Sequence, residues 1–213
     1  MSLTSTDGSA SEVTRSYPRD GKHHAICSAV YPLGVQPNKT VGQTSKKKVA
    51  IVFELDQKET EGKFVDNPMR VVKFITPTLG KQTTTAKSSA LRDIFTSWEG
   101  RSPNAKEDSN GFDILNWIGK KAIIVLETVE VGSRKYTNIL SILPSNSKNQ
   151  VKSTIDATIA PEWVTKLRAQ SVCDADWTSY KDGVLVTGDK EPVELVEKED
   201  ELDELFGDAS TSF

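Results

Sequence analysis

The 213-residue sequence is poor in the residue types on which most catalytic and metal sites depend. It has two cysteines and two histidines, and the histidines are adjacent, at positions 23 and 24. Two cysteines cannot form the disulfide framework of a small secreted domain, so we expect a reducing compartment. A structural zinc site takes four ligands in paired clusters, and His23, His24 and Cys27 have no second cluster. We therefore expect no metal and no cofactor.

Long apolar runs are also missing. None approaches the ~18 residues of a membrane-spanning helix, and the opening MSLTSTDGSASEVTRS lacks the apolar centre of a signal peptide. We therefore expect no membrane association and a cytoplasmic location. Walker-type glycine loops, nucleophile elbows and His pairs on a helix are absent as well. Since no two acids stand out as a catalytic pair either, the sequence predicts a protein that is not an enzyme.

Charge is divided unevenly along the chain. Residues 189–213 hold ten acids and two bases, a net charge of −8, so residues 1–188 carry +5 and the whole chain −3. A basic body with an acidic tail is typical of proteins that bind polyanions and carry a charged interaction arm. A tail that serves only solubility is the alternative. The tail also has Leu202, Leu205 and Phe206 at helical spacing, and the chain closes on Phe213.

Hydrophobic patterning predicts the order strand, strand, strand, helix, strand, strand over residues 23–144. The clearest strand is KKKVAIVFEL (46–55), in which Phe53 belongs to a wholly apolar face. The stretch SSALRDIFTSWEG (88–100) repeats its apolar residues at helical spacing between a serine cap and Gly100. The other expected strands are AICSAVYPL, which ends at Pro32, PMRVVKFIT (68–76), KKAIIVLETVEV (120–131) and RKYTNILSIL (134–143).

This order is the connectivity of the OB-fold, a five-stranded Greek-key barrel, with the helix between strands 3 and 4. The sequence thus predicts a mainly β protein in four parts. These are a flexible N-terminal arm (1–22), the OB-fold domain (23–144), a linker with the short docking helix PEWVTKLRAQ (145–183), and a disordered acidic tail (184–213). An unrelated five-stranded α+β sheet is the alternative fold. RSPNAKEDSNG (101–111) is expected to be a loop.

Basic residues gather at strand ends and turns, and several stand next to aromatic residues. Proteins that bind single-stranded nucleic acids combine a cationic groove for phosphates with rings that stack on bases. The candidate nucleic-acid-binding residues are Lys46, Lys47, Lys48, Arg70, Lys73, Phe74, Trp98, Arg101, Lys120, Lys121, Arg134, Lys135 and Tyr136. Each has a structural alternative. Lysines at strand ends protect sheet edges, and Trp98 completes the apolar face of its helix, so the core is the better expectation for its ring.

The stretches LRDIFTSWEGR (91–101), GFDILNWIGKKAIIVLE (111–127) and RKYTNILSI (134–142) resemble a family of phage-encoded single-stranded DNA-binding proteins with an OB-fold. The resemblance covers residues 23–144, and PEWVTKLRAQ resembles a segment that follows the barrel in such proteins. It implies that the protein binds and protects single-stranded DNA during phage DNA replication, recombination and repair in the bacterial host. It also implies that Trp98, Arg101, Lys120 and Tyr136 occupy positions of DNA contact.

Many single-strand binders of bacteria and phages end in acids closed by a terminal Phe, and recruit replication or recombination proteins through that end. By this resemblance, the partner-binding residues of the tail are Glu201, Asp203, Glu204, Leu205, Phe206, Asp208 and Phe213. This sequence departs from the pattern because residues 209–212 separate the last acid from Phe213. The choice between Phe206 and Phe213 as the anchor therefore stays open.

The sequence leaves further alternatives open. A homo-oligomer, the identity of the tail's partner, the preference for DNA over RNA and the number of nucleotides bound are not decided by it. A protein-interaction adaptor built on the same barrel is the alternative function, because a fold does not fix function.

Overall fold

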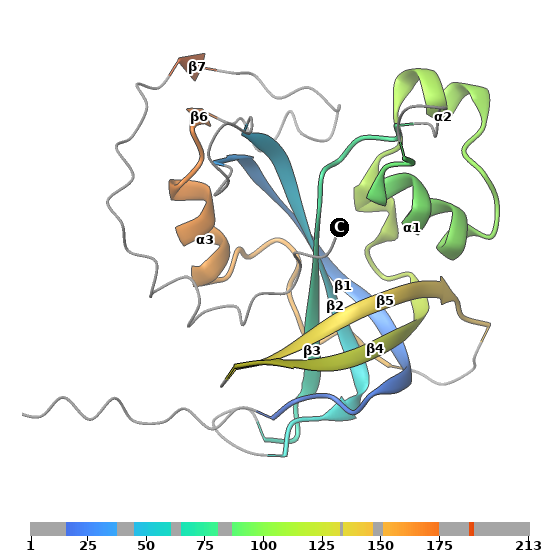
Figure 1. Cartoon of the computed structure of the whole chain (residues 1–213), viewed down its shortest axis with the longest axis vertical. Coiled ribbons are helices and arrows are strands. Elements are labelled where there is room, and N and C mark those ends of the chain that lie inside the picture. The colour runs from blue at the N-terminus through green and yellow to red at the C-terminus, as the bar shows by residue number, and fades with distance from the viewer. Residues whose placement is uncertain are drawn as a thin grey trace, which may run out of the picture.

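The computed structural model describes residues 16–37, 45–60, 65–80, 87–132, 134–146, 151–174 and 188–189. Strands dominate this part of the chain, with short helices between and after them (Figure 1). The elements, in chain order, are β1 (Gly21–Gln36), β2 (Lys46–Lys58), β3 (Pro68–Ile75), α1 (Ala90–Glu99), α2 (Ala105–Asn110), the 3₁₀ turn η2 (Ile114–Trp117), β4 (Lys121–Val131), β5 (Arg134–Pro144), α3 (Glu162–Ala169), β6 (Cys173–Asp174) and β7 (Gly188–Asp189).

Five strands form one antiparallel sheet in the order β3-β2-β1-β4-β5, which confirms the predicted mainly β class. The longest strand, β1, is central: it pairs with β2 from Ala25 to Gln36 and with β4 from Gly21 to Ile26. Figure 1 shows β4 and β5 crossing the direction of the other three strands. Within the described residues, no ladder of hydrogen bonds joins the edge strands β3 and β5, so the sheet is open there.

The prediction that the first strand ends at Pro32 is wrong, because β1 continues to Gln36. Proline cannot donate a hydrogen bond to a ladder, but a bulge accommodates it. The register between β1 and β2 shifts between Pro32 and Gly34. The Pro32 carbonyl accepts a hydrogen bond from Arg168 Nε at 2.9 Å. The bulge therefore absorbs the missing donor, and the strand continues beyond it.

The core lies between the inner face of the sheet and α1. Of the two candidate serine caps, Ser88 and Ser89, the helix uses Ser89, and it ends at Gly100, whose φ is +70°. Trp98 on the apolar face of α1 is fully buried, and its ring centre lies 5.5 Å from that of Phe53 in β2 and 4.9 Å from that of Trp117 in η2. The predicted helix and the predicted apolar face of β2 are thus confirmed, and together they form one aromatic core.

The segment 101–111, predicted to be a loop, contains the short helix α2. None of its residues is buried, so no hydrophobic periodicity marks it. Asn104 caps it: the side-chain oxygen accepts from the backbone N–H groups of Lys106 and Glu107. The Glu107 carboxylate in turn accepts from Asn104 N at 2.8 Å. The loop prediction is therefore wrong because a capping box, and not an apolar face, stabilises this helix.

The segment 151–172, which includes α3 and is called the strap below, covers the outer face of β1, β2 and β3. Val164 of α3 is fully buried there. The Trp163 ring packs edge-on against Tyr31, with ring centres 5.9 Å apart, and against Phe74, at 6.3 Å. The predicted docking helix therefore packs on the sheet of its own chain.

A buried carboxylate fastens the strap to the sheet. Glu54 in β2 has no exposed surface. One of its oxygens accepts from Ser28 Oγ and from Thr154 N, both at 2.7 Å, and the other accepts from Thr154 Oγ1 and from Arg70 Nε. Burial acts to raise the pKa of Glu54, but the hydrogen bonds from Ser28 and Thr154 and the charge of Arg70 outweigh it, so the pKa is lowered. The ionised carboxylate thus joins β1, β2, β3 and the strap.

We predict that this junction fails in acid. Because the pKa of Glu54 is lower in the folded protein than in the unfolded chain, the ionised group stabilises the fold above its unfolded pKa. That contribution is lost as the pH falls through the folded pKa. Glu54→Gln should therefore lower the free energy of unfolding by about 1–3 kcal/mol at neutral pH, and the difference from the wild type should shrink as the pH falls through the folded pKa. Urea unfolding followed by Trp fluorescence measures both values.

Glu162→Gln is the matched control, since its carboxylate lies on the exposed side of α3. It should change the free energy of unfolding by less than about 0.5 kcal/mol. A difference between wild type and Glu54→Gln that stays the same at every pH would show that the carboxylate charge does not hold the strap.

Candidate nucleic-acid interface

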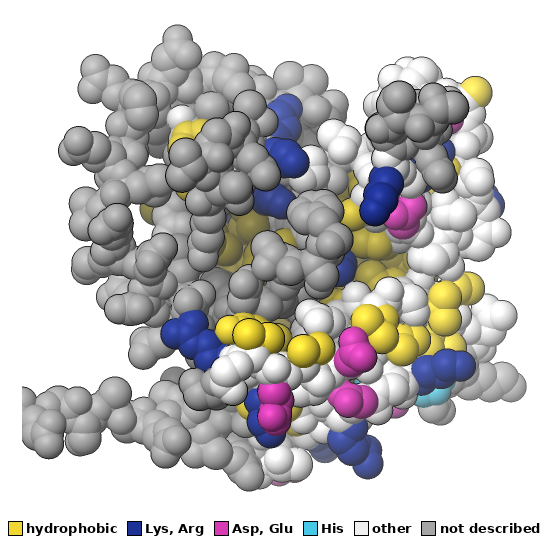
Figure 2. Space-filling model, viewed as in Figure 1, with side chains coloured by type: hydrophobic (Ala, Val, Ile, Leu, Met, Phe, Trp, Pro, Cys, Tyr) yellow, Lys and Arg dark blue, Asp and Glu magenta, His cyan; other side chains and the backbone are white. Residues whose placement is uncertain are grey.

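The three lysines that open β2 lie together at one end of the sheet. They stand opposite the last residues of β1, with Lys46 across from Gln36 and Lys48 across from Gly34. Among the described residues, Lys46, Lys47 and Lys48 have no carboxylate partner. Burial, and then the neighbouring charge of Lys46, lower the pKa of Lys48. Figure 2 shows basic side chains gathered beside the upper ends of β1 and β2.

Lys73 occupies the opening between the two edge strands. It lies opposite Ile51 in the β2–β3 ladder and is half-buried. Its Nζ donates to the Ile139 carbonyl of β5 at 3.3 Å, and burial lowers its pKa. In the described part of the chain it has no carboxylate partner. The ammonium group therefore spans the place where β3 and β5 share no backbone ladder.

Lys48 and Lys73 are both partly buried ammonium groups. Moving an ammonium group out of water costs free energy, and proteins normally offset this cost with a carboxylate. Neither side chain has one among the residues that the structure describes, so each holds a partly dehydrated positive charge. Ionisable groups perturbed by burial are concentrated at functional sites. A phosphate group would supply the missing negative charge at both positions.

Arg70 and Phe74 lie on the outer face of β3, beside the strap. Arg70 Nε is 3.3 Å from Glu54, and its Nη2 donates to Thr154 Oγ1 at 3.3 Å. Its side chain is still 45% exposed, so it can also meet a phosphate. The Phe74 ring is half-buried and packs against Trp163. Its contact with the strap occupies the surface that a base would need.

Trp98 and Lys120 belong to one network around Glu99. The Trp98 side chain is fully buried, and its Nε1 donates to the Lys121 carbonyl at 2.9 Å, so its ring offers no free face to a base. Lys120 pairs with Glu99, and its ammonium lies 5.5 Å from the centre of the Trp98 ring. Glu99 also accepts from Trp117 Nε1 at 2.8 Å. The charge of Lys120 is thus compensated within the protein.

Arg101 is compensated in the same way. Two of its nitrogens donate to the two oxygens of Glu107, each at 2.7 Å, and its guanidinium lies 4.9 Å from the centre of the Phe95 ring. The hydrogen bond from Arg101, followed by that from Asn104 N, lowers the pKa of Glu107 to about 2. Sequence reasoning missed both carboxylates, Glu99 and Glu107. Only Glu107 carried a signal, as the last residue of the pattern Asn-x-x-Glu, which is typical of a capping box.

The remaining predicted contacts lie on β4 and at the tip of the β4–β5 hairpin. Lys135 pairs with Glu130 at 2.9 Å. Arg134 is exposed, and Tyr136 is half-buried. Lys121 is half-buried at the start of β4. This hairpin group therefore contains one charge that is already paired and one ring that is only partly accessible.

Ion pairing divides nine of the ten predicted cations, all except Arg134, into two classes. Some have carboxylate partners: Arg70, Arg101, Lys120 and Lys135. Others have none among the described residues: Lys46, Lys47, Lys48, Lys73 and Lys121. The structure places Lys46–Lys48 at the start of β2 and Lys73 on the neighbouring strand, where Lys73 shares the inner face with Ile51 and Lys48 shares the outer face with Ala50 and Val52. The hairpin group lies on β4 and β5. The best candidate interface is therefore the start of β2 together with Lys73.

Part of the predicted organisation lies outside the described residues. This applies to the N-terminal arm up to residue 15 and to the whole predicted acidic tail (184–213) except Gly188 and Asp189. It also applies to the predicted partner-binding residues Glu201, Asp203, Glu204, Leu205, Phe206, Asp208 and Phe213.

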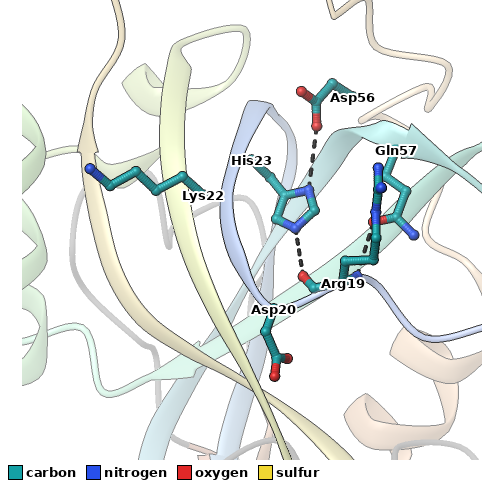
Figure 3. A pocket seen from close by; sticks show the side chains of 6 residues that line it. All are labelled: Arg19, Asp20, Lys22, His23, Asp56 and Gln57. Carbon is teal, nitrogen blue, oxygen red and sulfur yellow. Dashed lines mark hydrogen bonds and ion pairs between the residues drawn. The ribbon is translucent and has the colours of Figure 1, made fainter.

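A polar pocket lies beside the beginning of β1 (Figure 3). The His23 ring stands between two oxygens: Nε2 is 2.6 Å from the Arg19 carbonyl and Nδ1 is 3.4 Å from Asp56 Oδ1. Asp20 and Lys22 complete the charged part of the lining. The side chains of Arg19 and Lys22 are balanced by those of the two aspartates. The pocket therefore offers a phosphate no net positive charge, and we do not assign it to the interface.

His23, His24 and Cys27 do not converge. His23 pairs with Ile124 in the ladder and His24 with Ile123, and successive strand residues point to opposite faces. Cys27 is buried in the core, and burial raises the pKa of its thiol to about 12. In the described part of the chain, no three His, Cys, Asp or Glu side chains are grouped to hold a metal ion. Nor does any helix there have the length and apolar character to cross a membrane.

Comparison of the sequence with models of known protein families and with curated proteins finds no match.

The burial of Trp98 gives a prediction that tests its structural role. Trp98→Ala should lower the free energy of unfolding by about 3–5 kcal/mol, because it leaves a cavity between Phe53 and Trp117. Tyr136→Ala, at a half-buried position, should cost distinctly less. Urea unfolding of both variants gives the comparison. Wild-type stability of the Trp98 variant would refute the structural role.

Proposed function

We propose that the protein binds single-stranded DNA and protects it during phage DNA replication, recombination and repair, without catalysing a reaction. The observation that carries this proposal is the environment of Lys48 and Lys73. Both are partly buried on neighbouring strands, both have a lowered pKa, and neither has a carboxylate partner among the described residues. A chain of phosphates is a ligand that supplies negative charge at several such points at once.

We also propose that the sheet is an OB-fold barrel. The strand order β3-β2-β1-β4-β5, with α1 between β3 and β4, is that of such a barrel opened between β3 and β5. The contact from Lys73 Nζ to Ile139 O spans this opening. OB-folds bind oligonucleotides on the face of strands 2 and 3 and on adjacent loops. Here the strap covers the middle of the outer face, which leaves the lysine end of β2 and the opening at Lys73 to a strand.

The proposed binding is mainly electrostatic. Each phosphate neutralised by a lysine releases condensed counterions, so that for single strands the logarithm of the affinity falls with the logarithm of the salt concentration by about 0.7 per phosphate contact. Phosphates carry no sequence information, so contacts from Lys46–Lys48 predict binding with little sequence preference. The buried ring of Trp98 and the covered ring of Phe74 supply no stacking in this arrangement.

Replacing the three lysines of β2 tests the site. The variant Lys46→Gln/Lys47→Gln/Lys48→Gln should bind oligo-dT at least about tenfold more weakly at low salt, and its salt slope should be smaller by about 2 than that of the wild type. Fluorescence anisotropy of labelled oligo-dT over a series of NaCl concentrations measures both quantities.

The matched control is Lys58→Gln/Lys106→Gln/Lys152→Gln, which removes the same charge at exposed positions elsewhere. It should keep the wild-type slope. Equal losses in both triple variants would mean that net charge alone matters and that the assigned site is wrong. If the wild type binds neither single- nor double-stranded DNA at low salt, DNA binding itself is refuted and the adaptor alternative is favoured.

We further propose that the acidic tail recruits replication or recombination proteins and competes with DNA for the basic body. Removal of residues 189–213, with their net charge of −8, should tighten oligo-dT binding at low salt. The gain should vanish near 1 M salt, where the Debye length falls to about 3 Å. The same anisotropy titration measures it. Equal affinity of the truncated and intact chains at low salt would contradict the competition while leaving the lysine site untouched.

A further inference from the structure

The outer face of β1, β4 and β5 carries a regular pattern of side chains. Residues directly opposite one another in an antiparallel ladder point to the same side of a sheet. Two adjacent outward rows follow from the ladders: His24, Ile123 and Leu143 in one, and Lys22, Val125 and Ser141 in the other. Leu140, displaced where the β4–β5 register shifts, is 58% exposed. Figure 2 shows apolar side chains in a band along β4 and β5.

Within this face, β4 presents charges of opposite sign on either side of an apolar centre. Its inward residues Ala122, Ile124 and Leu126 are buried in the core, so the residues between and beyond them point outward. In order along the strand, the outward residues are Lys121, Ile123, Val125 and Glu127. Neither Lys121 nor Glu127 has an ion-pair partner among the described residues. The order is thus positive, apolar, apolar, negative.

We propose that a second copy of this chain packs on this face, forming a dimer with a two-fold axis between the two sheets. The axis runs at right angles to β4, level with Ile124. It reverses the strand direction, so Lys121 faces the partner's Glu127 and Ile123 faces the partner's Val125. Because a two-fold interface repeats every contact, both pairs occur twice.

The order of the charges selects this orientation. A two-fold axis parallel to β4 would set each Lys121 against the partner's Lys121 and each Glu127 against the partner's Glu127. Like charges placed against each other across an interface are unfavourable, and such repulsion excludes a competing arrangement. The pattern is complementary to itself only when the second strand runs in the opposite direction.

The dimensions of packed sheets also fit. With about 3.4 Å per residue, Lys121 and Glu127 each lie about 10 Å from the axis along β4. Sheets that pack face to face are about 10 Å apart and cross at about 30°. At that separation and angle, an extended Lys side chain and an extended Glu side chain meet.

The two kinds of contact have different roles. The apolar centre, with Ile123, Val125 and the neighbouring Leu143, provides the free energy of association by leaving water. The charges lie at the rim, where an exposed ion pair contributes little affinity but fixes the register. The strap packs on the other half of the sheet and does not occupy this face. The proposal is independent of DNA binding.

Charge reversal at two positions tests the pairing. Sedimentation equilibrium of the full chain should give twice the 23.4 kDa of one chain at micromolar concentration. Glu127→Lys, at an exposed position, sets lysine against lysine twice and should raise the dimer dissociation constant about tenfold or more. Lys121→Glu should do the same with glutamates. The double variant Lys121→Glu/Glu127→Lys restores opposite charges and should return the constant to within about threefold of wild type.

Lys106→Glu, which makes the same charge change as Lys121→Glu at an exposed position on α2, is the control and should dimerise as the wild type does. Circular dichroism checks that each variant is folded. A wild-type protein that stays monomeric at about 100 µM overturns the proposal. So does a Glu127→Lys variant that dimerises as tightly as the wild type, or a folded double variant that remains as weak as the single ones.

Discussion

The double pairing of β1 is the constraint on which the rest of the molecule depends. Its first residues form a ladder with β4, and most of its remaining length forms one with β2. The register with β2 shifts between Cys27 and Ala29 and again after Pro32, and such irregularities let a strand bend. In the described part of the chain, β1 alone connects the β2–β3 pair to the β4–β5 hairpin by backbone ladders, and the side chain of Lys73 adds one hydrogen bond from β3 to β5. Through it, the inner faces of both pairs meet α1 around Trp98.

The two halves of the outer face differ in what covers them. On β1, β2 and β3 the strap buries Val164 and packs Trp163 over the sheet, and the carboxylate of Glu54 fastens it there. That half has become a second core, which is why a ring such as Phe74 is not free to stack on a base. On β1, β4 and β5 no segment of the described chain packs in this way. A partly apolar face with unpaired charges at its ends is a surface suited to an interface.

Sequence periodicity predicted the elements that bury one apolar face, such as α1 with Trp98 among its apolar residues. It failed where another force decides: α2 depends on a cap, and the extension of β1 beyond Pro32 depends on a bulge. The partners and the burial of individual charged side chains were harder still to predict from the sequence. Lys120 and its partner Glu99 are far apart in sequence, and only the packing of η2 against α1 brings them together. Lys73 occupies an ordinary alternating position, and its burial arises from β5, which no local pattern reveals.

Pairing of charges within the fold concentrates the proposed binding on few cations. A lysine that already faces a carboxylate must give up that partner to gain a phosphate, whereas Lys48 and Lys73 gain one at no such loss. Lys46 stands opposite Gln36, ten residues along β1 from Ile26, where the β4 ladder begins, which is about 30 Å of strand. The proposed dimer face therefore lies away from Lys46–Lys48, and a dimer would carry two such lysine clusters. A strand long enough to reach both would bind the second at an effective concentration set by the span between them. Long DNA strands would then bind more tightly than short ones without any additional kind of contact. The dependence of affinity on DNA length would therefore measure dimer formation and not the strength of a single lysine site.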